Sequence, residues 1–409
     1  MTPPLPIYRK PQDYDTWPVV EALFKDKGLA RQHLDSYNTF LERGLQEVID
    51  DFGDLTIQTK DSNGELHTYR IVFGKITVEA PRVIEHDGTP IENVLPSMCR
   101  LRGFTYAAPM KLQVRVFRDD YHIDSREIYI GDLPVMLKSN ICVLSKMSRE
   151  ELIEAGEDPD DPGGYFIVNG AERAIVSLED LASNSIITSI DKRATVPRYI
   201  AKVLSVKGIQ RTQVTVTLKR GNVTVQIPWV SAPIPFIVLM RALGFESDLE
   251  IAKIISPLDE IISVIQPSFK RAEEILTEDE AIEYIGNRAA FGISREFRNA
   301  RVQYILDRYL LPHIGVERED RRRKGYFLAE VVRRVIELSL GYREPDDRDH
   351  YANKRLRLAG PLLSQVFARA FKKLLKDLKY QLERRFVAKM HLAIEAARLR
   401  WLGASWPQI

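Results

Sequence analysis

Apolar and polar residues follow different periods in successive parts of the chain. Apolar positions three or four apart over residues 31–50 predict an amphipathic helix. Over residues 53–80 the spacing shortens toward every second residue, which predicts strands, and residues 111–117 and 126–137 continue this pattern. Two apolar runs flank Asn169–Gly170, a dipeptide typical of the turn in a β-hairpin. The first part of the chain is therefore expected to combine a helix with several strands.

A second part is expected to begin near residue 180. Residues 212–227 alternate on both sides of a turn placed at Gly221–Asn222, which predicts a hairpin with one buried face. The buried face contains Val214, Val216, Leu218, Val223, Val225 and Ile227. Helical spacing then dominates, with segments predicted at 235–243, 247–256, 278–286, 298–310 and 325–340. Strand and helix patterns in both parts predict an α+β fold with two mixed modules.

From residue 361 onward the pattern is that of one long amphipathic helix, and Pro361 suits its first turn. The apolar side holds Leu363, Phe367, Ala370, Leu374 and Leu378. The other side holds Arg369, Lys372, Lys373, Lys376 and Lys379. Residues 360–400 contain ten basic and three acidic side chains, a bias that fits a helix following a phosphate backbone. From these residues alone, a solvated face that only keeps the protein soluble is the alternative.

Length and composition indicate a multidomain globular protein. Its 409 residues exceed the roughly 250–300 at which one hydrophobic core stops growing. The longest apolar stretch, residues 234–240, is far shorter than the ~20 residues of a membrane span, and no secretory signal opens the chain. The two cysteines form neither a disulfide framework nor a Cys-x-x-Cys pair, which fits a reducing cytoplasm.

Charge is segregated along the chain, although the net charge is only +2. Residues 321–409 carry 21 Lys or Arg and 9 Asp or Glu, a balance of +12, which leaves −10 for the first 320 residues. A basic C-terminal section on a mildly acidic body indicates one surface that meets a polyanion.

Residues 346–350 concentrate four side chains of the kind that bind a hard divalent cation: Asp346, Asp347, Asp349 and His350. A metal-dependent nuclease would use such a cluster for phosphoryl transfer. The four residues are nearly consecutive, however, and no further acidic group follows at a helical spacing. The favoured interpretation is an Asp-rich turn that caps the next element and pairs with Arg348, Lys354 or Arg355.

Seven stretches, in order, give the chain a resemblance to a known family: RQHLDSYNTFL (31–41), RLRGFTYAAPM (100–110), IGDLPVMLKSNIC (130–142), GGYFIVNGAERAI (163–175), PFIVLMRALG (235–244), LLPHIG (310–315) and DDRDHYANKRLRLAGPLL (346–363). The chain resembles the N-terminal part of the second-largest, beta-type subunit of archaeal and eukaryotic multisubunit DNA-directed RNA polymerases. A full-length beta-type subunit of such a nucleotidyltransferase is more than twice as long as this chain. The resemblance therefore implies a naturally divided subunit, a deliberately shortened piece or a truncated reading frame.

The resemblance implies a domain arrangement and a division of labour. Residues 1–178 and 346–409 would form a discontinuous protrusion domain, and residues 179–345 an inserted lobe. The catalytic Mg²⁺ of this family is held mainly by the largest subunit, so this chain is expected to hold no metal and no catalytic residue and to be inactive alone. Its expected partners are the largest subunit, the C-terminal half of the beta-type subunit, initiation and elongation factors, DNA and the RNA–DNA hybrid.

Carried over by position, the resemblance implies nucleic-acid contacts from five basic residues: Lys354, Arg355, Arg357, Lys373 and Lys376. Two other functions stay open. The basic helix could instead bury against acidic neighbours in a scaffold that binds only proteins, or the acidic cluster could serve a free-standing metal-dependent nuclease.

Overall fold

The computed structural model describes residues 15–384 with the exception of 61–65, 85–88, 93, 193–195, 209 and 290–293. The chain divides into two compact units. The discontinuous unit contains the residues up to Leu178 and those from Arg357 onward, and the inserted unit runs from Glu179 to Leu356. Both combine helices with antiparallel sheets, so the predicted α+β class is confirmed.

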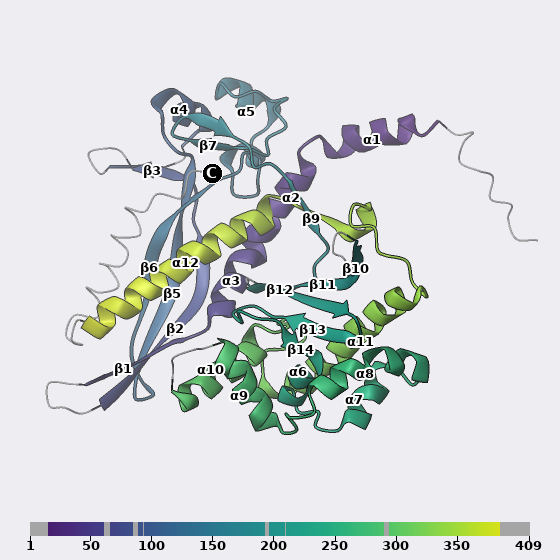
Figure 1. Cartoon of the computed structure of the whole chain (residues 1–409). Coiled ribbons are helices and arrows are strands. Elements are labelled where there is room, and N and C mark those ends of the chain that lie inside the picture. The colour runs from purple at the N-terminus through teal and green to yellow at the C-terminus, as the bar shows by residue number, and fades with distance from the viewer. Residues whose placement is uncertain are drawn as a thin grey trace, which may run out of the picture. The chain divides into compact units, whose positions relative to one another are not determined.

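The main sheet of the discontinuous unit has four antiparallel strands in the order β1-β2-β5-β6 (Figure 1). Their bounds are β1 Leu55–Lys60, β2 Leu66–Val78, β5 Ala107–Arg118 and β6 Tyr121–Pro134. Buried Leu112, Val114 and Val116 alternate along β5 with more exposed residues, as the period of a half-buried strand requires. Strands β5 and β6 are joined by a tight turn in which Asp119 and Asp120 both have positive φ, a conformation that Asp tolerates.

Helices pack against the sheet of this unit. The predicted helix over 31–50 is confirmed as α2 (Arg31–Thr39), a π-helical turn (Phe40–Gly44) and α3 (Leu45–Phe52). The smaller elements are α1 Trp17–Lys27, β3 Arg82–Ile84, β4 Pro90–Glu92, α4 Pro96–Arg102, α5 Arg149–Glu154, β7 Phe166–Val168 and β8 Ala171–Arg173, with a 3₁₀ turn at Val143–Lys146. The hairpin predicted at Asn169–Gly170 is confirmed, because Val168 pairs with Ala171 around that turn.

The inserted unit contains a five-stranded antiparallel sheet in the order β10-β11-β12-β13-β14. Its strands are β10 Ile186–Asp191, β11 Arg198–Lys207, β12 Gln210–Lys219, β13 Asn222–Gln226 and β14 Ile234–Pro235. The β12–β13 hairpin confirms the prediction, but its turn is formed by Arg220 and Gly221 and not by Gly221 and Asn222. Asn222 already pairs with Lys219, so the sequence-based turn was one residue too late.

Helices pack on the sheet of the inserted unit and supply most of its core. They are α6 Phe236–Ala242, α7 Asp248–Ile255, α8 Asp259–Arg271, α9 Glu278–Ala289, α10 Arg295–Arg308 and α11 Arg321–Leu340. Helix α6 is buried on all sides, and α11 lies against β11 and β12. Helix α8 was not predicted, because Pro267 lies inside it and proline normally argues against a helix interior.

Two further observations bear on the site. Strand β9 (Leu178–Leu181) pairs with β15 (Lys354–Arg357), so the chain crosses twice between the units in this two-stranded sheet. In the described part of the chain, no helix is both long and apolar enough to span a membrane.

Candidate nucleic-acid interface

Helix α12 (Ala359–Arg384) is the long helix predicted from the C-terminal pattern, and it lies against α2, α3 and β1 of the same unit (Figure 1, yellow). Of the five residues predicted for the apolar side, Leu363, Phe367 and Leu378 are buried, and Ala370 and Leu374 are half-buried. Phe371, which the sequence pattern did not single out, anchors the helix with its ring 5.5 Å from that of Phe52 and 5.5 Å from that of Phe73. The helix face toward the core is therefore held by large aromatic contacts.

The first turn of α12 approaches α2 very closely. The Gly360 N–H donates to the Ser36 hydroxyl at 3.0 Å. A Cβ atom at Gly360 would lie 2.3 Å from the Ser36 carbonyl oxygen, so only glycine fits here. This contact fixes where α12 begins, and hence which side chains face solvent.

The solvent face of α12 is basic. Arg369, Lys372, Lys373 and Lys376 are exposed, and none of the four forms an ion pair or hydrogen bond with the described part of the chain. Between Ala359 and Tyr380 the sequence contains a single acidic residue, Asp377. Among the described residues these four positive charges are therefore not neutralised, which favours attraction of a polyanion.

Lys373 and Lys376 lie together on this face, three residues apart on one helix. Lys354 and Arg355 belong instead to β15 and to the inserted unit. Arg357 is half-buried at the point where the chain re-enters the discontinuous unit. The five predicted residues are thus divided between the two units.

Lys354 is engaged in an ion-pair network. Its ammonium group lies 2.6 Å from a carboxylate oxygen of Glu179 and 3.6 Å from one of Asp349. The hydrogen bond to Glu179 is the main reason that the pKa of Lys354 is raised. Glu179 precedes Lys354 by 175 residues, so no local sequence signal could have indicated this partner.

Arg355 is exposed, and its guanidinium donates to the backbone carbonyls of Ala352 (2.9 Å) and Lys354 (2.7 Å). These bonds hold the side chain close to its own turn while leaving its charge in solvent. Arg355 is therefore a cation of fixed position, in contrast to the lysines of α12.

The acidic cluster forms a turn that hydrogen bonds hold to neighbouring residues and to β10. One carboxylate oxygen of Asp346 accepts from the Thr188 N–H and hydroxyl, both at 2.7 Å, and the other accepts from Arg343 at 2.8 Å. Partial burial favours the neutral acid, but the bonds from Thr188 and Arg343 outweigh it and lower the pKa of Asp346. Asp346 is therefore an ionised anchor that ties the turn to β10.

The other members of the cluster have separate tasks. Asp347 accepts the N–H of Asp349 at 2.8 Å, and His350 Nδ1 accepts the N–H of Ala352 at 3.1 Å. Within the described ranges, no group of three or more His, Cys, Asp or Glu side chains is arranged to hold a metal ion. The geometry fits the turn interpretation, with Lys354 as one predicted partner and Arg343 in place of Arg348.

Comparison with known proteins decides the family. The model of the family described as RNA polymerase beta subunit matches residues 28–399. The chain belongs to this family. The beta-subunit chain is 46% identical over 383 residues to DNA-directed RNA polymerase subunit Rpo2 of Saccharolobus solfataricus, covering 93% of this chain and 33% of the relative. It is also 39% identical over 387 residues to subunit Rpo2N of Methanococcus vannielii, covering 93% of this chain and 76% of that relative.

This beta-subunit chain corresponds to the N-terminal part of the archaeal-type second subunit, so the resemblance seen in the sequence is confirmed. It spans about 33% of the length of the Rpo2 relatives. Both relatives are named as subunits of DNA-directed RNA polymerase.

Proposed function

We propose that this chain forms part of the wall of the nucleic-acid cleft of DNA-directed RNA polymerase, where it contacts DNA and the RNA–DNA hybrid. The discontinuous unit is then the protrusion and the inserted unit the lobe. The observation that supports this most is the exposed face of α12, whose cations have no partner in the described part of the chain. Cations on a rigid helix bind phosphates whatever the base sequence, as transcription of any gene requires.

Within this proposal the chain positions nucleic acid and performs no chemistry. We assign it no catalytic residue and no metal ligand; the Mg²⁺ of the complete polymerase is held mainly by the largest subunit. Its partners are the largest subunit, the C-terminal part of the beta-type subunit, and initiation and elongation factors. The isolated chain is expected to be inactive in nucleotidyl transfer.

The basic residues differ in how much they contribute. Lys373 and Lys376 are exposed without a described partner, so they contact phosphates at no cost in broken ion pairs. Lys354 contributes less, because binding a phosphate competes with its bond to Glu179. Arg355 and Arg357 contribute positive charge close to the junction between the units.

The test is the salt dependence of nucleic-acid binding by polymerase assembled with the double variant Lys373→Ala/Lys376→Ala. Each phosphate contact contributes about one unit to the slope of log K against log salt concentration, so the double variant should lose about two units. The matched control replaces Lys25 and Lys146, which are exposed in the same unit and have no described partner. Equal slopes for the double variant, the control and the unmodified enzyme would refute the assignment of this face.

A photo-crosslinking group at position 373 separates this function from a protein-only scaffold. In assembled, transcribing polymerase the group is expected to crosslink to nucleic acid. Crosslinks to protein alone would mean that α12 is covered by a neighbouring subunit and that its charge serves assembly.

A further inference from the structure

In the described part of the chain, only the second half of β12, from Thr215 to Lys219, pairs with β13. Thr215 pairs with Gln226, and in the same register Gln213 would face Pro228. Proline has no N–H to donate to the Gln213 carbonyl, so the pairing cannot continue. The next residue, Trp229, has a φ of 66°, in the left-handed region that bulky side chains rarely adopt. The chain therefore leaves the sheet here, and the first part of β12 has no paired strand on this side among the described residues.

The register shows where the backbone groups of this part of β12 point. The two-residue turn after Lys219 makes that residue a hydrogen-bonded partner of Asn222, and such pairs recur at every second position. Arg211 and Gln213 therefore present their N–H and C=O groups toward the β13 side and not toward β11. No backbone group of the described residues outside the strands bonds to them. An open strand edge of this kind is a template for another strand.

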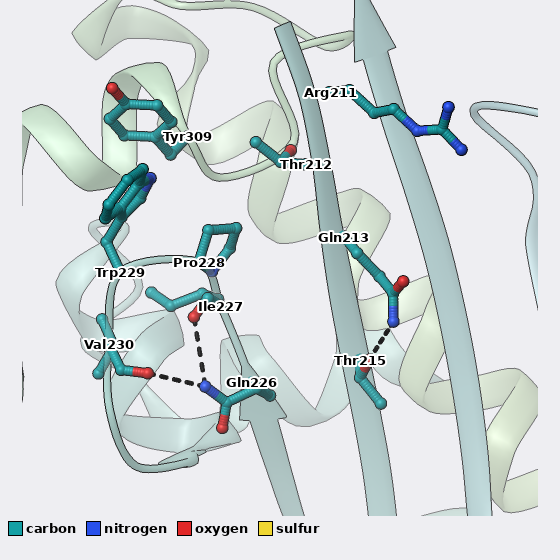
Figure 2. Close-up of a pocket in the computed structure, with 10 residues that line it drawn as sticks. All are labelled: Arg211, Thr212, Gln213, Thr215, Gln226, Ile227, Pro228, Trp229, Val230 and Tyr309. Atoms are coloured by element: carbon teal, nitrogen blue, oxygen red, sulfur yellow. Dashed lines mark hydrogen bonds between the residues drawn. The ribbon is translucent and has the colours of Figure 1, made fainter.

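A hollow of about 510 Å³ borders the open edge (Figure 2). Trp229 lies on its rim, 64% exposed, with its ring 5.7 Å from that of Tyr309. The Gln226 side chain donates to the Val230 carbonyl at 2.7 Å and so holds the loop that carries the tryptophan. The Thr212 hydroxyl, also in the lining, is buried and has no hydrogen-bond partner among the described residues. The hollow thus combines an aromatic platform with polar groups that have unused bonding capacity.

Exposed arginines lie on α10, the helix that ends at the residue before Tyr309. Arg301 and Arg308 are exposed on α10, and neither forms an ion pair within the described part of the chain. Burial raises the pKa of Tyr309, and the positive charge of Arg301 opposes that rise. Arg211, by contrast, is neutralised by Asp180 at 2.7 Å. A ligand with acidic side chains is favoured on the α10 side.

We propose that this hollow binds an extended, acidic peptide segment of a partner protein, which adds a short strand to the open edge of β12. Its backbone exchanges hydrogen bonds with Arg211 and Gln213. A proline or aromatic side chain of the peptide lies on Trp229, and its acidic side chains face Arg301 and Arg308. Strand addition draws affinity from main-chain bonds and specificity from side-chain contacts. The site belongs to the inserted unit and does not depend on a nucleic-acid role for α12.

A peptide matches the open edge better than a single-stranded nucleic acid does. Exposed aromatic rings and arginines are also found in single-strand binding sites, so these groups alone do not distinguish the two. The exposed backbone edge of β12 does distinguish a peptide from a nucleic acid. It alternates N–H donors with C=O acceptors, whereas a phosphodiester backbone offers acceptors only and cannot satisfy the carbonyls of Arg211 and Gln213.

The test begins with random decapeptides displayed on phage, selected against the immobilised full chain. Binding of the selected peptides is then compared between Gln213→Pro, which removes an N–H on the hollow side, and Gln213→Ala, which keeps it. The proline leaves the β11 ladder intact, because Gln213 does not bond to β11 in this register. Trp229→Ala tests the platform, with Leu249→Ala, 75% exposed in the same unit, as its control. Circular dichroism melting verifies the fold of each variant.

Selected peptides are expected to be acidic, to carry a proline or aromatic residue, and to bind both Gln213→Pro and Trp229→Ala at least about tenfold more weakly than the controls in fluorescence anisotropy. N-methylation of alternate peptide amides should weaken binding similarly, because it blocks strand pairing; this arm decides the outcome if the proline variant does not fold. Failure to select any peptide, or peptides insensitive to Trp229→Ala and to N-methylation, overturns the proposal. Binding of oligo-dT that is lost in Trp229→Ala, with no peptide selected, assigns the hollow to nucleic acid instead.

Discussion

Replacing Phe371 by alanine tests whether the core contacts of α12 hold its basic face in place. The phenyl ring is 1% exposed and lies between Phe52 of α3 and Phe73 of β2, with Phe367 6.0 Å away on its own helix. Alanine removes all of these contacts at once, without changing any charge. The effect therefore isolates packing from electrostatics.

The expected magnitude follows from the burial of the ring. Truncating a buried phenylalanine to alanine costs about 3–5 kcal/mol, because apolar surface is lost and a cavity remains. The contacts with neighbouring rings, each worth about 0.5–1.5 kcal/mol, are part of that cost and not an addition to it. We expect a loss of about 4 kcal/mol in the unfolding free energy of the discontinuous unit. Phe371→Leu fills most of the volume and should cost about 1.5 kcal/mol or less.

Hydrogen exchange measured by mass spectrometry at increasing urea concentrations is the suitable assay, because it reports each unit separately. Amides of α12 and α3 should exchange through a less costly opening in Phe371→Ala. Those of the inserted unit, which has its own core, should not change. Leu101→Ala, at a position 88% exposed in the same unit, is the control. Protection of α12 equal to that in the control would refute the reasoning that these aromatic contacts hold the helix.

Two further predictions concern the inserted unit. Lys324 is fully buried, and burial lowers its pKa from 10.5 to about 8. The unfolded chain keeps this proton to higher pH, so the free energy of unfolding should rise by about 3 kcal/mol between pH 8 and pH 10.5. In urea titrations, Lys324→Met should not show this rise. The same pH profile in Lys324→Met and the unmodified chain would contradict the prediction. Asp346→Asn should lower the free energy of unfolding by about 1–3 kcal/mol, because its bonds to Thr188 and Arg343 weaken. The decrease should be the same in EDTA and in Mg²⁺. A Mg²⁺-dependent difference in unfolding free energy would instead support a metal site at this cluster. Cation-dependent DNA cleavage that is lost in Asp347→Ala would do the same.

Local periodicity predicted much of the secondary structure. The helix over 31–50, the hairpin at Asn169–Gly170 and the amphipathic pattern after Pro361 all appear in the structure, because period and turn chemistry depend only on near neighbours. The misses have local causes as well. Pro267 obscured α8, and the glycine-centred turn of the β12–β13 hairpin was shifted by one residue.

Contacts between distant residues had no counterpart in the sequence pattern. The acidic turn was expected from its composition, but its anchor on Thr188 is 158 residues away. The choice of Lys354 as the residue paired with Glu179 likewise depends on β9 and β15 being neighbours. Lys354 and Lys373 look alike in the sequence, yet one is in an ion pair and the other is exposed without a described partner.

The sequence by itself determined the family, the α+β class and the segregation of positive charge toward the C-terminal section, since each depends on residue identity and order. Only the tertiary structure decided which charges are free to bind and where the sheet of the inserted unit has an open edge. The hollow beside Trp229 borders the part of β12 that extends beyond its pairing with β13, which ends at Gln226. Pairing and burial depend on which segments meet in space, and a linear pattern of apolar and polar residues does not contain that information.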